Sequence, residues 1–422
     1  MRILVISNYF PPYELGGYEQ LCRDVCVRLR ARGHAVLALT SRRGVGKREG
    51  GDSAESNTLR RLHLQIEPGL TPLLQFLFAR PRRERHNAAV LHEQVTRFRP
   101  DVIFCWNLEN LGPGLALAAE RFPGVGVAHW LAGRSPKEPD VYTAYWTTPG
   151  HRFWMTWVKR LARPWALHKL AAGDPRPQLR LEHVAVVSHF LRDQAVQRGF
   201  LPPSALVIHN GVELDEFAAP VRHRAPDAPW RLLQAGRLDP QKGAHTTLQA
   251  LALLLQNDRL DVRLTLAGDG PPAYRQLLNS LVEQHELENY VQFTGWLPRA
   301  VMPALLAEHD TLILATTENE PLARIMLEAM ASGLVVVGTL TGGTGEALRH
   351  EETGLTFAPH DAAGLARQVA RLIDDPALYN RLAGAGRAAV RAEYGLEYMV
   401  DQCEALLRRA RQAARGSQPV GN

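Results

Sequence analysis

Residues 231–270 read RLLQAGRLDPQKGAHTTLQALALLLQNDRLDVRLTLAGDG, and this stretch decides the fold. It opens with the apolar segment Arg231–Ala235, typical of a buried strand, and continues into the loop Gly236–Gly243. The next segment, Ala244–Leu255, has the apolar spacing of a helix, and Val262–Ala267 is again typical of a strand. A strand, a loop, a helix and a second strand in this order predict a parallel β-α-β unit.

The same alternation continues toward residue 338. The further elements that we expect are helices over Pro272–His285, Met302–Glu308 and Ile325–Ser332 and strands over Val291–Thr294, Thr311–Ala315 and Leu334–Gly338. A domain that alternates in this way folds as a doubly wound sheet, with its ligand at the carboxyl ends of the strands.

The N-terminal half shows the same organisation. Its opening elements are a strand over Arg2–Ser7, a loop over Pro11–Gly17, a helix over Tyr18–Arg32 and a strand over Ala35–Thr40. Later strands are expected at Asp101–Cys105, Val125–Trp130, Val184–Ser188 and Ala205–Ile208. We therefore predict an α/β protein with two doubly wound, Rossmann-like domains that face a cleft.

Composition suggests where the domains meet. Asp215–Pro229 is rich in alanine, proline and charge, which suits a linker. We place the first, acceptor-side domain at residues 1–214 and the second, ligand-binding domain at residues 215–390. Residues 391–422 contain an Arg-rich helix, predicted over 391–415, that we expect to return to the first domain.

The overall composition is that of a globular protein. The chain has 422 residues, of which 45% are apolar and 22% are charged. No apolar run approaches the roughly 20 residues that span a bilayer. The short apolar run at the N-terminus does not suit a signal peptide, so we expect a cytoplasmic protein. The four cysteines are too few for a disulfide framework and are interpreted as buried apolar residues.

Charge is distributed unevenly along the chain. Residues 1–210 hold 29 Lys and Arg against 17 Asp and Glu, so their net charge is +12. The remaining 20 basic and 26 acidic residues give residues 211–422 a net charge of −6. A basic half favours an anionic partner, such as a phosphorylated acceptor, a lipid surface or a nucleic acid. The alternative is an Arg-rich surface that is simply solvated.

The loop Gly236–Gly243 carries the first chemical signal. Arg237 offers a planar set of donors and Lys242 a point charge, and both suit phosphate oxygens. A glycine on each side lets a ligand approach the backbone closely. An ordinary loop with two surface cations is the alternative.

Two carboxylates, Glu320 and Glu328, form the second signal. A fully helical segment would hold them ~12 Å apart, which exceeds the roughly 5–10 Å of a glycosidase acid–base pair. The spacing suits two contacts on one extended ligand, such as a nucleotide sugar, whose hydroxyls a carboxylate can bind. Two exposed helix carboxylates are the alternative, although Glu328 lies in an apolar run where an unpartnered charge would be costly.

Gly342-Gly343-Thr344-Gly345-Glu346 forms the third signal. The stretch follows an expected strand and precedes an expected helix, where bare amides bind anions. A glycine-rich turn without a ligand is the alternative.

Together these features resemble the retaining GT-B glycosyltransferases of group 1 (family 4-like), which include sucrose-phosphate synthases and bacterial mannosyl- and glucosyltransferases. The resemblance covers nearly the whole chain and depends on the order and spacing of individually weak motifs. Besides the three signals, these motifs are Gly16-Gly17, His129, Asn210-Gly211-Val212, Gly268-Asp269-Gly270-Pro271 and Phe293-Thr294-Gly295.

The resemblance implies a role for each matched residue. Arg237 and Lys242 would neutralise the donor diphosphate as it leaves, Glu320 would contact the transferred sugar, and Glu328 the donor ribose. His129, expected just after a strand, would contact the donor sugar near the reacting carbon; a packed histidine beside Trp130 is the alternative. The further donor-binding residues that it implies are Gly16, Gly17, Gly236, Gly295, Trp296, Leu322, Ala323, Arg324, Gly342, Gly343 and Thr344.

The implied reaction is transfer of a sugar from a nucleotide-sugar donor to an acceptor hydroxyl, with retention and without a protein nucleophile. Fixed cations would stabilise the charge that grows on the leaving diphosphate. No Asp-x-Asp occurs in the chain, so we expect neither a metal nor another cofactor. Two departures from the family pattern are Pro321, which has no amide hydrogen to offer the sugar, and Glu213, where an Asp often follows Asn-Gly-Val.

Residues 134–180 are a candidate acceptor region. They hold nine Lys and Arg, three Asp and Glu, and the tryptophans Trp146, Trp154, Trp157 and Trp165. Aromatics mixed with cations suit a lipid–water interface, and a second such stretch runs from Leu73 to Arg85. We expect a glycan, lipid-linked or small-molecule acceptor and peripheral contact with the anionic inner face of the membrane. The alternative is an insertion packed on the first domain.

Other functions fit less well. Gly268-Asp269-Gly270-Pro271-Pro272-Ala273 matches the dinucleotide fingerprint, but two prolines and the lack of a clear acidic partner disfavour a dehydrogenase. No recognised nucleic-acid module is present, so nucleic acid is not expected as a partner. The remaining alternatives are a nucleotide-sugar epimerase or hydrolase of the same fold, or an inactive homologue that only binds nucleotide sugars.

Overall fold

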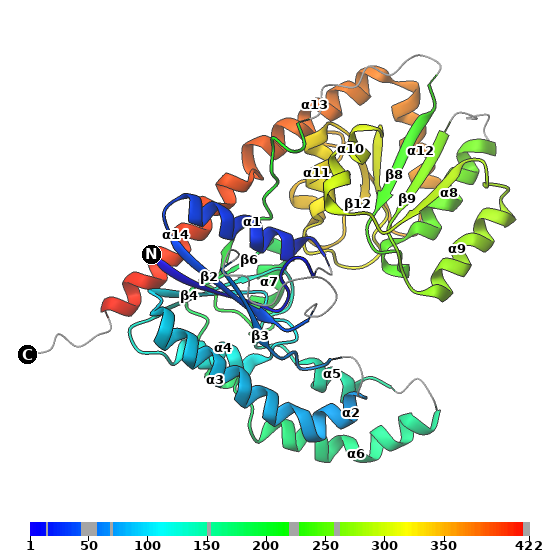
Figure 1. Cartoon of the computed structure of the whole chain (residues 1–422). Coiled ribbons are helices and arrows are strands. Elements are labelled where there is room, and N and C mark those ends of the chain that lie inside the picture. The colour runs from blue at the N-terminus through cyan, green and yellow to red at the C-terminus, as the bar shows by residue number, and fades with distance from the viewer. Residues whose placement is uncertain are drawn as a thin grey trace, which may run out of the picture. The chain divides into compact units, whose positions relative to one another are not determined.

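The computed structural model describes residues 1–13, 16–43, 57–67, 71–149, 153–218, 228–256 and 262–416. The chain divides into two compact units, each with its own sheet (Figure 1). Unit 1 comprises Met1–Val187, Leu191–Ile208 and Val400–Asn422, whereas unit 2 comprises Ser188–Phe190 and His209–Met399. Residues 209–214 and 391–399, which the sequence analysis had placed outside the second domain, therefore group with unit 2.

Within the described residues, parallel strands form the sheet of unit 1 in the order β3-β2-β1-β4-β5-β6-β7. The strands are β1 (Arg2–Ser7), β2 (Ala35–Ser41), β3 (Thr58–Leu62), β4 (Val102–Trp106), β5 (Gly126–Leu131), β6 (Val184–Val186) and β7 (Leu206–Val207). The chain adds β2 and β3 on one side of β1 and the later strands on the other. This reversal of strand order creates a switch point at the carboxyl ends of β1 and β4, where such sheets bind ligands.

Continuous burial explains why β1 forms the centre of this sheet. Ile3, Leu4, Val5 and Ile6 are all at most 1% exposed, as expected for a strand covered on both faces. The helices that complete the unit are α1 (Gly17–Ala31), α3 (Arg80–Phe98), α4 (Pro113–Glu120), η2 (Arg176–Gln178) and α7 (His189–Gln197), the last of which starts with residues of unit 2.

A second, smaller core lies beside the main core of unit 1. It is formed by α2 (Pro72–Leu74), the π-helix η1 (Gln75–Ala79), α5 (Val141–Thr147) and α6 (Phe153–Ala171), which gather at one end of the unit in Figure 1. Its buried members are Phe76, Tyr142, Trp146, Ala166 and Leu170. Part of the aromatic region 134–180 therefore packs internally.

The sheet of unit 2 is also parallel and, within the described residues, has the order β10-β9-β8-β11-β12-β13. Its strands are β8 (Trp230–Ala235), β9 (Val262–Ala267), β10 (Val291–Gly295), β11 (Thr311–Leu314), β12 (Val335–Thr339) and β13 (Leu355–Phe357). Its helices are η3 (Pro240–Lys242), α8 (Ala244–Gln256), α9 (Pro272–Gln284), η4 (Arg299–Val301), α10 (Met302–Ala307), α11 (Arg324–Ser332), η5 (Gly342–Glu346), α12 (Ala362–Asp374) and α13 (Pro376–Glu393).

The last helix, α14 (Leu396–Gly416), belongs to unit 1 from Val400 onward. It approaches β5 so closely that a Cβ on Gly126 would lie 2.6 Å from the Ala410 backbone. Glu404 lies 3.0 Å from Nε2 of His34 and 3.2 Å from Nη1 of Arg32. Burial alone would raise the pKa of Glu404, but hydrogen bonds from Arg408, Arg32 and His34 lower it to about 2.

The predicted class of two doubly wound α/β units is confirmed, and one local expectation is wrong. The predicted single helix over 391–415 is wrong, because Tyr394 and Leu396 bond to the backbone of Val212 and separate α13 from α14. Strands β3 and β13 were not expected; β3 carries two arginines, and β13 has only three residues. The linker predicted over 215–229 lies partly outside the described residues. All four cysteines are buried and free, as expected.

Candidate active site

The loop after β8 lies against the loop after β9 at the carboxyl edge of the unit 2 sheet. Gly236 and Gly268 both have positive φ, at 137° and 143°. A Cβ on Gly268 would lie 1.8 Å from the Gly236 carbonyl oxygen, and a Cβ on Gly270 1.7 Å from that of Leu238. Only glycine fits at these positions, and the contact fixes the path of the loop that carries the two cations.

Asp239 connects Arg237 with Lys242. Its carboxylate accepts a hydrogen bond from the Lys242 amide at 3.2 Å, which caps η3, and lies 3.5 Å from Nη1 of Arg237. The Lys242 ammonium makes a close ion pair with the Glu320 carboxylate, whereas the side chain of Arg237 remains 70% exposed. The structure therefore joins Arg237, Lys242 and Glu320 in one chain of polar contacts.

Glu320 also joins the glycine pair after β12 to this cluster. The Gly343 amide donates to the Glu320 carbonyl at 2.7 Å, and a Cβ on Gly343 would lie 1.9 Å from the Pro321 carbonyl oxygen. Gly342 has φ of 62°, and its Cβ would lie 2.1 Å from the Glu320 carbonyl oxygen. The two glycines let the loops after β11 and β12 touch.

The expectation of bare amides at this glycine stretch needs correction. The Gly343 amide is used by Glu320, and the amide of the buried Thr344 donates to the Thr341 carbonyl at 3.2 Å. The segment is moreover a 3-10 helix of five residues rather than the start of a longer helix. The Gly343 and Thr344 amides are therefore already engaged within the chain.

Glu328 is buried, but it is not an unpartnered charge. Its carboxylate lies 2.5 Å from Nη1 of Arg299 and 3.0 Å from Nε of Arg324, and its side chain is 3% exposed. The alternative of an exposed helix carboxylate is therefore excluded for Glu328, and two guanidiniums supply the partners that its buried charge requires. The predicted contact with a donor ribose remains a prediction.

The residues between the two glutamates form the approach to α11. Leu322 and Ala323 are buried, and the Leu322 carbonyl accepts a hydrogen bond from Nδ2 of Asn210 at 2.9 Å. Helix α11 begins only at Arg324, so Glu320 lies outside the helix that carries Glu328. The Asn-Gly-Val stretch thereby fixes the loop on which Glu320 lies.

Gly295 and Trp296 follow β10 at the same edge of the sheet. Gly295 has φ of 70°, and its carbonyl accepts a hydrogen bond from the Gly268 amide at 2.9 Å. The side chain of Trp296 is large and apolar, yet this residue is 71% exposed. An exposed aromatic ring beside the glycine loops can stack on a flat ligand group.

Gly16 and Gly17 lie in unit 1, at the start of α1. Gly16 is extended, and its amide donates to Oε2 of Glu19 at 3.0 Å, while Gly17 begins the helix. Residues 14 and 15 of the predicted loop lie outside the described part of the chain. The two glycines follow β1, next to the switch point of their sheet.

His129 needs a correction. The resemblance would place it just after a strand, but it lies within β5, inside the strand expected over Val125–Trp130; it is 1% exposed, and its Nε2 is 3.5 Å from Oε1 of Glu120. Burial alone would raise the pKa of Glu120, but hydrogen bonds from His129 and from the Arg180 and Leu181 amides lower it. These contacts favour the interpretation of His129 as a packed histidine rather than as a residue that contacts a ligand.

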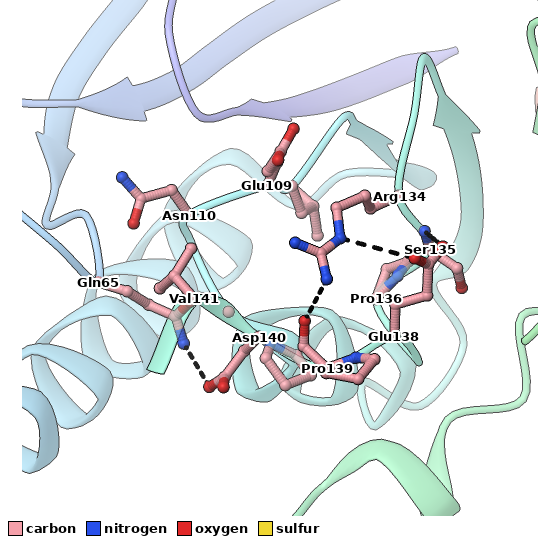
Figure 2. Close-up of a pocket in the computed structure, with 13 residues that line it drawn as sticks. Gln65, Glu109, Asn110, Arg134, Ser135, Pro136, Glu138, Pro139, Asp140 and Val141 are labelled. Carbon is pink, nitrogen blue, oxygen red and sulfur yellow. Dashed lines mark hydrogen bonds and ion pairs between the residues drawn. The ribbon is translucent and has the colours of Figure 1, made fainter. Parts of the chain in front are cut away.

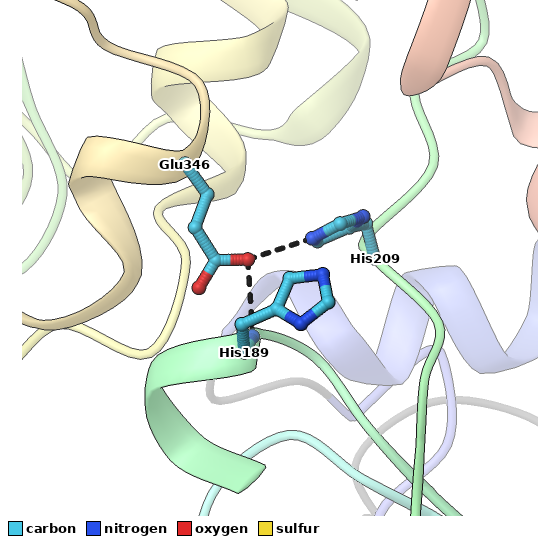
Figure 3. A group of neighbouring side chains, drawn as sticks. All are labelled: His189, His209 and Glu346. Atoms are coloured by element: carbon cyan, nitrogen blue, oxygen red, sulfur yellow. Dashed lines mark hydrogen bonds and ion pairs between the residues drawn. The ribbon is translucent and has the colours of Figure 1, made fainter. Parts of the chain in front are cut away.

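Sequence reasoning missed a cluster formed by His189, His209 and Glu346 (Figure 3). Their possible ligand atoms all lie within 4.8 Å of one another, and imidazole and carboxylate are suitable metal ligands. However, the Glu346 carboxylate already accepts hydrogen bonds from the His189 and Phe190 amides at 3.0 Å and lies 2.8 Å from Nε2 of His209. It therefore acts as a cap on α7.

Two sequence signals could have found this cluster. His209 directly precedes the Asn-Gly-Val motif, and Glu346 closes the glycine stretch. Burial alone would raise the pKa of Glu346, but the hydrogen bonds from His209 and from the two amides lower it. The carboxylate is thus kept ionised, as a helix cap requires.

The structure contains no helix, among the residues it describes, that combines the length and apolar character needed to cross a bilayer.

Two family models match consecutive parts of the chain. The model of "Glycosyltransferase Family 4" matches residues 15–216, and that of "Glycosyl transferases group 1" matches residues 215–389. The first match falls mainly in unit 1, and the second lies within unit 2.

Individual proteins agree with these matches. The chain is 27% identical to a glycogen synthase of Mycobacterium tuberculosis over 99% of this chain and 97% of that protein. It is 28% identical to a D-inositol 3-phosphate glycosyltransferase of Streptomyces scabiei over 68% of this chain and 73% of that protein.

A solved structure extends the agreement to the fold. The sucrose-phosphate synthase of Thermosynechococcus elongatus superposes with a TM-score of 0.73 at 20% identity, covering 98% of this chain and 99% of that one. The two family models together account for residues 15–389, so the chain belongs to the group 1 glycosyltransferases and is a glycosyltransferase with the two-domain GT-B fold.

Proposed function

We propose that this glycosyltransferase takes a sugar from a nucleotide-sugar donor and transfers it, with retention, to an acceptor hydroxyl. The observation that carries the proposal is the contact chain Arg237–Asp239–Lys242–Glu320 at the carboxyl edge of the unit 2 sheet. It places two cations beside a carboxylate, as a ligand with a diphosphate next to a polyol requires.

The Lys242–Glu320 ion pair suggests how the site works. The carboxylate neutralises the ammonium, and both side chains are less than one-third exposed. A donor would bring its phosphates to Arg237 and Lys242 and its sugar hydroxyls to Glu320. As the sugar–oxygen bond breaks, negative charge grows on the diphosphate, and the fixed cations stabilise it.

We further propose that neither a metal nor another cofactor takes part in transfer. The proposal is supported by the two cations and by the lack of an Asp-x-Asp sequence anywhere in the chain. Transfer should therefore persist in excess EDTA at the rate measured in its absence. A loss of activity that Mg²⁺ or Mn²⁺ restores would contradict this part of the proposal.

The donor site is tested with Lys242→Ala, which removes the ammonium, and Lys242→Arg, which keeps a positive charge. We expect Lys242→Ala to abolish transfer without unfolding the chain, and Lys242→Arg to keep part of the activity. Arg367→Ala changes an exposed cation on α12 of unit 2 and serves as the control. Wild-type rates in Lys242→Ala would refute the assignment.

The donor is identified by a thermal-shift screen of UDP-, GDP- and ADP-sugars, since a ligand that binds only the folded state raises the melting temperature. Incubation of the best donor without an acceptor then separates transfer from its alternatives. Rapid, complete turnover of the donor alone would favour an epimerase or hydrolase of the same fold. Donor binding without turnover, with or without acceptors, would favour an inactive homologue.

We also propose that unit 1 contacts an anionic membrane surface near a glycan or lipid-linked acceptor. One face of α6 carries three exposed apolar side chains spaced four residues apart. They are Trp157 (52% exposed), Leu161 (80%) and Trp165 (51%). Cations lie on the same helix, including the exposed Arg160 and Arg163. Such a mixture suits the interface of an anionic bilayer.

The structure narrows the region that would make this contact. Tyr142 and Trp146 are buried in the small core and are removed from the candidate surface. The side chains of Phe153 and Trp154 lie outside the described residues. The second candidate stretch contributes Leu74 and Phe78, which are 41% and 67% exposed.

Flotation with phosphatidylglycerol liposomes at low salt tests the membrane contact. We expect the wild type to float and a Trp157→Ser, Leu161→Ser double variant to remain at the bottom. Val27→Ser, which changes a 48% exposed residue on α1, is the matched control. No flotation of the wild type would end the membrane proposal.

A further inference from the structure

A hollow opens in unit 1 at the carboxyl edge of its sheet (Figure 2). Its walls are Gln65, which follows β3, and the segments that follow β4 and β5, namely 108–113 and 134–141. Its empty volume is about 430 Å³, including the part open to solvent. The hollow is therefore an open recess that a ligand group can enter from solvent.

Hydrogen bonds between the connecting segments hold the walls of the hollow in place. The Asn110 side chain accepts from the Ile66 amide at 2.9 Å and donates to the Ile66 carbonyl at 3.2 Å. The Asp140 carboxylate caps α5 through the Thr143 amide at 2.8 Å and accepts from Nε2 of Gln65 at 3.2 Å. These bonds tie the segment after β3 to the segments after β4 and β5, so the lining residues are fixed relative to one another.

One hydrogen bond connects the hollow to the loop after β1. Nδ2 of Asn8, the residue that follows β1, donates to the Glu109 carbonyl at 3.0 Å. The same loop leads to Gly16 and Gly17, the candidate donor-contacting residues of unit 1. A ligand in the hollow would thus lie beside the switch point of the sheet, where α/β proteins bind ligands.

The charges of the hollow differ from those of the surrounding basic half of the chain. The charged side chains of its lining are three carboxylates, Glu109, Glu138 and Asp140, and one guanidinium, Arg134. Arg134 donates to the Pro139 carbonyl at 2.8 Å and lies 3.5 Å from Oε2 of Glu138, so part of its charge is already compensated within the hollow (Figure 2). A phosphate in this hollow would meet excess negative charge.

Glu109 remains available to a ligand. Its side chain is exposed and, among the described residues, makes no ion pair or hydrogen bond through its carboxylate. An ionised carboxylate accepts hydrogen bonds through both oxygens, and hydroxyl groups are its natural neutral donors. The hollow therefore suits a ligand rich in hydroxyls and poor in negative charge.

We infer that this hollow binds the acceptor, that the acceptor end bound there is an unphosphorylated polyol or sugar, and that Glu109 holds its hydroxyls. The inference rests on the proposed function and adds a substrate class to it. The Streptomyces scabiei relative is described as acting on D-inositol 3-phosphate. Because carboxylates outnumber cations in the hollow, this chain should instead favour acceptors that carry no phosphate at the end bound there.

Acceptor kinetics with a panel of uncharged and phosphorylated compounds test the inference. Maltoheptaose and myo-inositol represent uncharged acceptors, and D-inositol 3-phosphate represents a phosphorylated one. We expect transfer to at least one uncharged compound, and a rise of about tenfold or more in its KM in Glu109→Ala, because a hydrogen bond to a charged group is lost. Glu109→Gln, which keeps one acceptor oxygen, should lie between Glu109→Ala and the wild type.

Two controls separate a loss of acceptor binding from general damage. Glu182→Ala removes another exposed carboxylate of unit 1 and should keep the wild-type KM for both substrates. The donor KM and the melting temperature should stay unchanged in Glu109→Ala, because the side chain is exposed. Preference for the phosphorylated compound, or an unchanged acceptor KM in Glu109→Ala, would overturn the inference.

Binding without donor keeps the inference separate from the proposed function. Saturation-transfer NMR with the uncharged compounds alone should give a signal in the wild type that Glu109→Ala loses. If no nucleotide sugar shifts the melting temperature, the proposed function fails whatever the NMR shows. If a nucleotide sugar binds but every uncharged compound gives no signal, or gives equal signals in the wild type and the variant, the inference about the hollow fails.

Discussion

Replacing Glu328 by alanine should destabilise unit 2 more than replacing any exposed glutamate. The carboxylate is buried between two guanidiniums, with Nη1 of Arg299 at 2.5 Å and Nε of Arg324 at 3.0 Å. The side chains of these arginines are only 19% and 10% exposed. Without the carboxylate, two positive charges would face each other in a site with little water.

The size of the effect follows from this geometry. Removing one partner of a buried ion pair costs about 3–5 kcal/mol, because the remaining charge loses its compensation. For a domain of about 150–250 residues, each kcal/mol lowers the melting temperature by about 2–4 °C. We therefore expect Glu328→Ala to melt about 6–20 °C below the wild type.

Differential scanning calorimetry of the full chain measures this shift, with Glu283→Ala, an exposed glutamate of α9, as the control. A triple variant, Glu328→Leu with Arg299→Met and Arg324→Leu, should recover most of the loss, because apolar groups can replace a buried ion cluster. Because Arg324 is also an implied donor-binding residue, a raised donor KM in the triple variant reports a contact of Glu328 or Arg324 with the donor, and an unchanged KM argues against both. A melting temperature of Glu328→Ala within about 2 °C of the wild type would refute the structural role.

Two further predictions concern stability. Glu404→Gln should lower the melting temperature at pH 6, because the pKa of Glu404 is about 2 in the folded chain and near 4.5 in the unfolded chain. Circular dichroism should show that the difference in melting temperature between the wild type and the variant shrinks as the pH falls from about 4.5 toward 2. A difference that stays constant over this range would contradict the prediction. Gly343→Ala would bring a Cβ to 1.9 Å from the Pro321 carbonyl oxygen. Both the rate of transfer and the melting temperature should therefore fall. Wild-type activity in this variant would count against the observed contact between the two loops.

Local patterns were enough to predict most of unit 2. Between Trp230 and Thr339 its strands and α-helices differ from the expected bounds by at most one residue at either end, because each strand is a short apolar run closed by a glycine or a polar residue, whereas β13, α12 and α13 were not predicted. The same patterns did not predict β3, whose two arginines hide its pairing with β2. They also could not show that Val212 would interrupt the last helix through a contact distant in sequence.

In the candidate site, too, local patterns predicted the residue types but not the contacts between residues distant in sequence. Residue type and order were enough to single out Arg237, Lys242 and Glu320, because phosphate and hydroxyl recognition require cations and carboxylates. The sequence could not show that Arg299, 29 positions before Glu328, would reach its carboxylate, or that Glu120 would hold His129 within β5. Each of these contacts joins residues from different elements, so no local pattern contains it.

By itself, the sequence therefore determined the alternation of strands and helices, the family and the residue types at the carboxyl edge of unit 2. These follow from periodicity and side-chain chemistry, which act over a few residues. Only the tertiary structure decided that Lys242 meets Glu320, that Glu328 is compensated by arginines, and that an acidic hollow opens in the basic half. The physical reason is that charge compensation and cavities depend on distances in space, which packing sets and spacing along the chain does not.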